Sequence, residues 1–355
     1  MNNEISKIIS FLRFPTTVLV VILHAYTTTR GIINVENSVW YNHISYIFSL
    51  NFGEIGVPMF FFISGYLFFQ KYSPSLHCYI EKNKRRIKTL LIPYIIWNTI
   101  FIFTYWILQN IDSINTYFSG ANMAINDYKL VNYFRAYWDS SNWDKGNGVP
   151  ILQPYWYIRN LIILCIISPI IAILIKYLKW ITFIIPLLFW IFSLHLALIY
   201  SSLTFFILGA ILAIHNTNII TLIRKWESII YISFITLFIY VYVIHFYYPN
   251  NFELYIHRVT LVIGIPLFFC LAYRLKDKIQ IKSLYSQSSF IIYTLHLPVM
   301  LALRKFEYKM INNQTELGNV ILYIISIYIT IWICIIIYKI INKYYNKFLV
   351  ISTGR

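Results

Sequence analysis

RFPTTVLVVILHAYTTTRGII, residues 13–33, is a mostly apolar stretch that begins with an arginine and holds one histidine, His24, near its middle. Its length is close to the roughly 20 residues that an α-helix needs to cross a bilayer. Because an α-helix turns about 100° per residue, we expect Arg13 and His24 on one helix face, about 16 Å apart along the axis. An ionisable side chain at membrane depth is costly and marks a candidate functional site. The alternative for His24 is a structural histidine that hydrogen-bonds a neighbouring helix.

The composition predicts a membrane protein along the whole chain. Of its 355 residues, 59% are hydrophobic and only 12% are charged, whereas soluble domains are about 45–50% apolar and about 25% charged. The predicted fold class is all-α, a polytopic membrane protein of about ten transmembrane helices. The predicted spans are 14–33, 51–70, 89–109, 154–175, 180–199, 201–215, 229–247, 258–275, 287–303 and 319–339. A membrane domain would cover residues 1–345, with a long external loop at 110–153 and a tail at 346–355.

Lysine and arginine are unevenly distributed between the two predicted faces of the membrane. Nearly all the clustered ones lie in the N-terminal segment, in the loops 71–88, 176–179, 216–228 and 276–286, and after residue 339. Loops rich in Lys and Arg stay in the cytoplasm, so both termini and the tail are predicted to be cytoplasmic. This asymmetry accounts for the formal net charge of +16 and predicts contact with a lipid bilayer rather than with nucleic acid.

The four cysteines point to neither a disulfide framework nor a metal site. Cys165, Cys270 and Cys334 fall inside apolar runs and Cys78 in a basic loop, without the paired spacing of metal ligands. We therefore predict no metal.

A cluster of five basic residues precedes the third predicted span. The basic cluster consists of Lys82, Lys84, Arg85, Arg86 and Lys88. Clustered Arg and Lys side chains favour polyanionic groups, which suggests a phosphate-binding mouth. The alternative is a topology signal that also contacts anionic lipid.

Other polar or aromatic side chains at membrane depth are candidates for a substrate channel. They are Glu54, Ser64, Trp156, Arg159, Tyr293 and His296. Tyr293 and His296 are three residues apart and hence neighbours on one helix face. Arg159 is expected to face protein or water rather than lipid. For Glu54 the alternative is an interfacial side chain that reaches outward, and His195, His215 and His245, at span ends, are predicted to be structural.

The loop 110–153 is the only long one between predicted spans. It holds Trp138, Asp139, Trp143 and Asp144, and aromatic rings with carboxylates suit sugar binding. The alternative is an ordinary interfacial lid.

Together these segments resemble the acyltransferase-3 family of integral membrane acyltransferases, which are O-acetyltransferase-like. Arg13 and His24 reproduce the family's pattern of arginine, ten residues and histidine, and FFFISGYLFF at 60–69 is similar to its second-span signature. KRRIKTLLIPY at 84–94, WYIRNL at 156–161 and FIIYTLH at 290–296 are similar to later family segments. Where the family has two arginines three apart, this chain has Arg85 and Lys88. Lysine keeps the charge but loses the planar fork.

The resemblance implies transfer of an acyl group, most often acetyl, from cytoplasmic acyl-CoA to a hydroxyl of a cell-surface polysaccharide or its lipid-linked precursor. It implies His24 as the catalytic residue, and Arg13, Arg85, Arg86 and Lys88 as the acyl-CoA-binding residues. His24 would act as a general base or be acylated itself.

The same resemblance implies a multi-pass protein of the bacterial cytoplasmic (inner) membrane. No cofactor is expected besides acyl-CoA as the donor co-substrate. Many relatives carry an appended esterase-like domain, so any second transfer step would need a separate periplasmic partner. The rival function is a transporter or flippase of an envelope precursor, for which broken spans and buried ionisable groups would serve equally well.

Overall fold

The computed structural model describes residues 3–30, 38–115, 118, 123–140, 148–192, 197–310 and 315–355. Within these ranges the chain consists of helices and connecting segments, without a β-strand. This confirms the all-α prediction. His195, Trp143 and Asp144, singled out above, lie outside the described residues.

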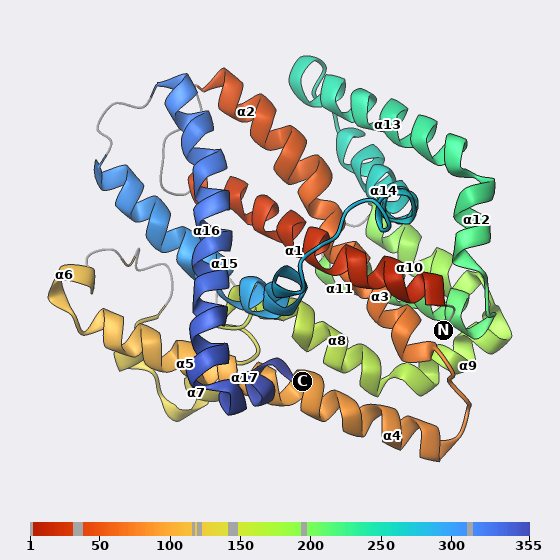
Figure 1. Cartoon of the computed structure of the whole chain (residues 1–355), viewed down its shortest axis with the longest axis horizontal. Coiled ribbons are helices and arrows are strands. Elements are labelled where there is room, and N and C mark those ends of the chain that lie inside the picture. The colour runs from red at the N-terminus through yellow and green to blue at the C-terminus, as the bar shows by residue number, and fades with distance from the viewer. Residues whose placement is uncertain are drawn as a thin grey trace.

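Each of the ten predicted spans contains at least one helix (Figure 1). The helices in these spans are α1 (Asn3–Arg30), α3 (Gly56–Phe69), α5 (Ile92–Gln109), α8 (Trp156–Ile166), α9 (Ser168–Leu178), α10 (Ile181–Phe192), α11 (Ala197–Ile214), α13 (Glu227–Tyr247), α14 (Glu253–Leu275), α15 (Ser283–Met310) and α16 (Glu316–Tyr344).

Fewer than ten of these segments are long enough to cross a membrane. By length and composition, the described residues contain seven such segments, or nine if each of two bent helix pairs is one span. The predicted span 180–199 holds α10, whose 12 described residues are too few for a hydrocarbon core of about 30 Å. The chain is thus a multi-pass helical membrane protein.

Two predicted loops are helical instead. The span that contains α3 begins at Val39, because the aromatic segment before it continues as α2 (Val39–Ser45), η1 (Tyr46–Phe52) and η2 (Gly53–Ile55). The predicted loop 71–88 forms α4 (Leu76–Arg86), which η3 (Ile87–Leu91) joins to α5. Ser75 caps α4, since its hydroxyl accepts a hydrogen bond from the backbone N–H of Cys78 at 3.2 Å. The basic cluster therefore has a defined helical geometry.

Helices α3 and α11 approach each other so closely that their backbones touch. A Cβ atom added to Gly65 would lie 2.1 Å from the Phe206 carbonyl oxygen, and one added to Gly209 would lie 2.1 Å from the Phe62 carbonyl oxygen. Only glycine allows such an approach of two backbones. This contact fixes α3, which carries Ser64, against the core.

Helix α1 runs through the middle of the molecule (Figure 1) and packs beside α15. The rings of Phe14 and Tyr285 stack at a centroid distance of 5.1 Å, and ten residues further along α1 the ring of His24 reaches that of His296. Because both pairs advance in the same chain direction, α1 and α15 are parallel. This arrangement brings the two histidines to the same depth.

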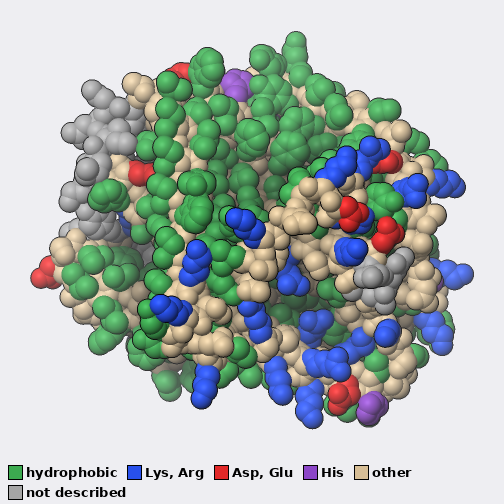
Figure 2. Space-filling view, in the orientation of Figure 1, with side chains coloured by type: hydrophobic (Ala, Val, Ile, Leu, Met, Phe, Trp, Pro, Cys, Tyr) green, Lys and Arg blue, Asp and Glu red, His purple; other side chains and the backbone are tan. Residues whose placement is uncertain are grey.

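The segment predicted as a tail folds back onto the helices. It forms α17 (Asn346–Thr353), in which Leu349 is only 1% exposed. The Trp97 indole N–H donates to the Ser352 carbonyl at 2.9 Å, which ties α17 to α5. Figure 2 shows Lys and Arg side chains gathered over the lower and right parts of the face, where α4, α17 and the two termini lie. We call this part of the molecule the basic end.

Candidate functional site

Two histidines meet inside the helix bundle. The ring centroids of His24, from α1, and His296, from α15, lie 5.1 Å apart with an interplanar angle of 43°. His24 is half-buried and His296 is 0% exposed. The sequence marked both residues separately as inward-facing candidates, and the parallel packing of α1 and α15 makes them one site.

Backbone carbonyls fix the tautomer of His296. Its Nδ1 atom lies 3.0 Å from the Ile292 carbonyl oxygen and 2.7 Å from that of Tyr293. Carbonyl oxygens only accept hydrogen bonds, so Nδ1 carries the proton and the other ring nitrogen, Nε2, presents a lone pair. Nε2 is buried and has no hydrogen-bond partner, although buried polar groups are normally paired. His296 thus offers an acceptor atom inside the bundle.

A series of aromatic rings continues from this pair towards α8. The Tyr293 ring lies 6.2 Å from His296 and 6.0 Å from Tyr157, measured between centroids. The hydroxyls of Tyr157 and Ser64 are hydrogen-bonded at 2.9 Å. Four of the predicted candidates, His24, His296, Tyr293 and Ser64, therefore belong to one connected group.

Tyr157 is the member of this group that sequence reasoning missed. Its position directly after Trp156, near the start of the predicted span 154–175, is typical of an interfacial aromatic belt. Instead, its ring packs against Phe61 at 4.5 Å and its hydroxyl reaches Ser64, as described above. Trp156 is half-buried and lies 6.0 Å from the Phe61 ring, beside the group rather than in it.

The structure divides the basic cluster into side chains with different roles. Lys82 donates to the carbonyl oxygens of Phe68 at 2.6 Å and of Gln70 at 3.0 Å, so it satisfies the C-terminal end of α3. Arg86 is half-buried, and its guanidinium lies 5.6 Å from the Phe68 ring. Arg85 and Lys88 are exposed. Lys84 is exposed as well, so these three side chains and Lys84 remain available for a ligand at the basic end.

Helix α4 lies beside α8, because the Tyr79 hydroxyl donates to the Ile166 carbonyl at 3.1 Å. Arg86, from α4, lies next to Phe68 of α3. Phe68 is one helical turn from Ser64, which contacts Tyr157 of α8. Arg13 is exposed on α1, and none of the described acidic residues forms an ion pair with it.

Arg159 is a structural anchor for the external loop. Its guanidinium donates to the Trp138 carbonyl at 2.6 Å and to the Asn160 side-chain oxygen at 3.1 Å, and it lies 4.8 Å from the Trp138 ring. The structure does not bring it to the histidine pair.

Glu54 also lies away from the histidine pair. Its carboxylate pairs with His257 at 2.9 Å in a pocket between η1–η2 and the α13–α14 turn. His245, expected to be only structural, lines the same pocket. His257 was not considered from the sequence. Among the described residues, no three His, Cys, Asp or Glu side chains gather as metal ligands do.

The comparisons with known proteins give one match. A protein-family model described as an acyltransferase domain, of the acyltransferase-3 family, matches residues 7–339. No curated protein and no solved structure matches the chain significantly.

Proposed function

Because the chain belongs to the acyltransferase-3 family, whose model spans nearly all of it, we propose that it is a membrane O-acyltransferase. It would move an acyl group, acetyl in the simplest case, from cytoplasmic acyl-CoA to a hydroxyl of a cell-surface polysaccharide or its lipid-linked precursor. We place it in the bacterial inner membrane with both termini in the cytoplasm. The observation that supports this best is the contact of His24 and His296 inside the helix bundle, joined through Tyr293 and Tyr157 to Ser64.

In the direct route, His24 acts as a general base. The acceptor hydroxyl attacks the carbonyl carbon of the thioester while His24 takes the hydroxyl proton. The new C–O bond forms, the C–S bond breaks, and His24 returns the proton to the departing sulfur. The products are an acyl ester and the free thiol of CoA.

In the second route, a ring nitrogen of His24 first attacks the carbonyl carbon of the thioester, so that an N–C bond forms, the C–S bond breaks, and CoA leaves as the free thiol with the proton that the ring gives up. The acceptor hydroxyl then attacks the acyl-imidazole, which forms the ester and breaks the N–C bond, and the hydroxyl proton returns to the ring. The routes differ in whether a labelled acyl group remains on the protein when acceptor is withheld.

His296 is proposed as a positioning residue. Its Nδ1–H donates to two backbone carbonyls, which fix the ring. Its Nε2 atom, on the opposite side of the ring, keeps a lone pair that can accept a hydrogen bond. With ring centroids 5.1 Å apart, a small shift lets an N–H of His24 donate to that lone pair. This would orient His24 and leave its other nitrogen to act on the substrate, as the third member of a catalytic triad does for its histidine.

The basic end is proposed to hold the polyanionic part of acyl-CoA. Arg13, Arg85, Arg86 and Lys88 would contact its phosphates, because guanidinium and ammonium groups bind phosphate oxygens strongly. The long flexible arm of CoA would then carry the thioester inward. Arg13 and His24 are about 16 Å apart along one helix face, a span that such an arm can bridge.

A transporter or flippase of an envelope precursor is the second candidate. The observation in its favour is the bending of two helix pairs, by 65° between α8 and α9 and by 107° between α11 and α12 (Ile219–Lys225). Broken helices are common at transport sites. A flippase has no use for acyl-CoA, so donor binding separates the two functions.

The test is incubation of purified, vesicle-reconstituted protein with [14C]acetyl-CoA and envelope glycan. We expect alkali-labile label on the glycan and release of an equal amount of free CoA. Movement of glycan across the vesicle membrane without any consumption of acetyl-CoA would favour the flippase.

A further inference from the structure

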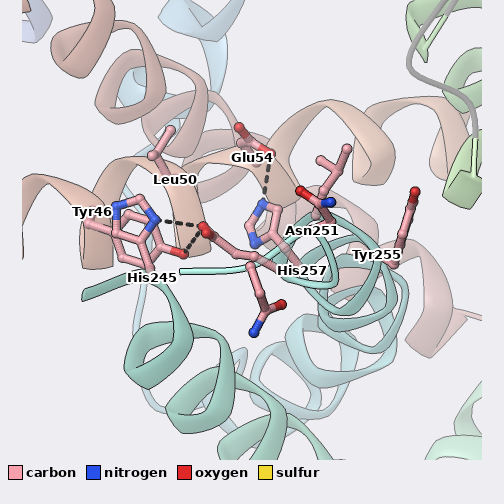
Figure 3. Close-up of a pocket in the computed structure, with 10 residues that line it drawn as sticks. Tyr46, Leu50, Glu54, His245, Asn251, Tyr255 and His257 are labelled. Carbon is pink, nitrogen blue, oxygen red and sulfur yellow. Dashed lines mark hydrogen bonds and ion pairs between the residues drawn. The ribbon is translucent and has the colours of Figure 1, made fainter. Parts of the chain in front are cut away.

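A second polar site lies away from the histidine pair. It is a pocket of about 580 Å³ between η1–η2 and the turn that joins α13 to α14 (Figure 3). This volume is in the range of sites for small molecules. Its polar lining includes two carboxylates, two imidazoles, two amides and two phenols.

Two histidine–carboxylate pairs hold the polar groups of this pocket in place. One oxygen of Glu253 accepts hydrogen bonds from His245 Nδ1, at 2.6 Å, and from the Tyr46 hydroxyl, at 3.1 Å. The other pair joins Glu54, from η2, to His257 Nε2, from α14, at 2.9 Å, and Figure 3 shows these side chains pointing towards one another. In these contacts each carboxylate uses only one of its two oxygens. The second oxygen of each remains available to accept a hydrogen bond.

Further hydrogen-bonding capacity comes from His257 and the rim. The Nδ1 atom of His257 is buried without a hydrogen-bond partner, and the side chain of Asn251 is exposed at the mouth. An amide both donates and accepts, and an imidazole nitrogen does one or the other. The site therefore combines carboxylate oxygens in fixed positions with an amide at its opening that can donate or accept a hydrogen bond.

The lining fits a neutral, hydroxyl-rich ligand. Among the residues that the structure describes, the lining contains no Lys or Arg, so an anionic group such as phosphate would meet two carboxylates without a Lys or Arg in the lining to balance it. Hydroxyl groups donate to carboxylates and exchange hydrogen bonds with amides. The half-exposed ring of Tyr255 supplies apolar area of the kind that the C–H faces of a sugar ring cover.

The pocket lies far from the basic end. Helices α13 and α14 have 21 and 23 residues, so the turn between them is about 30 Å from their other ends. At those other ends Arg274 pairs with Glu227, next to the basic segments 224–225 and 274–278. The donor and the pocket ligand would therefore approach from opposite sides.

The pocket nevertheless adjoins the turn of α1 that leads to His24. A Cβ atom added to Gly53 would lie 3.0 Å from the backbone nitrogen of Leu23 and 3.1 Å from the Leu19 carbonyl oxygen. Glu54 follows Gly53 directly, so the helical turn that carries it packs on the residues just before His24.

We propose that this pocket binds the acceptor, as a neutral sugar unit of an envelope glycan that enters from the face opposite the basic end. The proposal rests on the proposed function. It adds a specific site, made by Tyr46, Glu54, His245, Asn251, Glu253 and His257.

The first test uses steady-state kinetics of the reconstituted protein with envelope glycan as acceptor. Glu54→Gln and Glu253→Gln keep the side-chain size but remove the charge. Each should raise the KM for glycan about 10-fold or more and leave the KM for acetyl-CoA unchanged. Asp127→Asn, at an exposed position outside the pocket, is the matched control. An unchanged glycan KM in both pocket variants would overturn the proposal.

The second test does not depend on folding of a charge variant. Asn251→Cys is treated in intact cells with a bulky membrane-impermeant maleimide, and acyl transfer to the native glycan is measured. Transfer should fall at least about 10-fold after labelling, while acetyl-CoA binding is retained. Complete labelling with undiminished transfer, or labelling only in inverted vesicles, would refute the proposal. Absence of transfer by the wild-type protein in the same cells would instead refute the proposed function itself.

Discussion

The histidine pair and the basic cluster differ in what surrounds them. His24 and His296 project from two long parallel helices into the interior, and backbone carbonyls orient the His296 ring. Arg85 and Lys88 are exposed on the short segment α4–η3. Charges in water are screened and bind weakly one by one, whereas buried groups hold a fixed geometry. The interior pair therefore suits chemistry, and the exposed cluster suits recruitment of a charged substrate.

The largest effect is expected from removing His24. His24→Ala should lower the turnover of acyl transfer at least ~100-fold, the low end for loss of a general base, while the protein still inserts and binds acyl-CoA. Turnover per inserted molecule is the measurement. His215→Ala, at an exposed position, serves as the control and should change little. Near-normal turnover of His24→Ala would return this residue to a structural role.

His296 should follow with a smaller effect. If it positions His24, His296→Ala should lower turnover about 10-fold to 100-fold, as for other residues that orient a reacting side chain, and should shift the pH dependence of turnover. A purely structural residue would change the amount of folded protein but not the pH profile. The pH–turnover curve of the folded fraction therefore decides between the roles, and an unchanged curve would argue against positioning.

Removing the cluster's arginines should affect affinity instead of chemistry. Arg85→Ala combined with Arg86→Ala should raise the KM for acyl-CoA about 10-fold with a smaller change in turnover, since contacts made equally in ground and transition state alter only binding. The effect should weaken as salt rises. Binding of acyl-CoA to purified protein is the check. Unchanged affinity with reduced insertion would support the topology-signal alternative.

The smallest effect is expected at Lys82, which belongs to the cluster in sequence but caps α3 in the structure. Lys82→Met should lower stability by about 1 kcal/mol without changing the KM for acyl-CoA. Thermal unfolding in detergent and acyl-CoA titration measure the two quantities. A raised KM in this variant would show that the whole cluster contacts the donor.

The sequence alone predicted the parts of the structure that depend on long apolar runs. Each predicted span contains a helix, and His24 and His296 could be singled out because a histidine at membrane depth is rare and costly. The close contact of α3 with α11 depends on Gly65 and Gly209, two small residues that lie inside predicted spans. Hydropathy could not predict the helices 76–86 and 346–353, because they lie outside the spans and owe their positions to α8 and α5.

The sequence could not predict which candidate side chains contact one another, because these contacts depend on which helices lie side by side in the fold. Arg159 and His296 were equally plausible from their depth, yet one anchors the Trp138 loop and the other faces His24. Tyrosine is common at the membrane interface, so the sequence gives no reason to single out Tyr157, and only the position of α3 shows its hydroxyl at Ser64. The pocket of Glu54 and His257 joins residues 203 positions apart, a distance over which no local pattern operates.

The central claim, that His24 acts on the acyl group and not on donor binding, is tested most directly by a single-turnover experiment. Reconstituted protein is first loaded with [14C]acetyl-CoA, then mixed with envelope glycan and quenched at intervals. Wild-type protein should pass its label to the glycan within the time of one turnover. His24→Ala should bind the same amount of acetyl-CoA and keep the label on CoA at least ~100 times longer. Transfer from the variant at the wild-type rate would contradict the account.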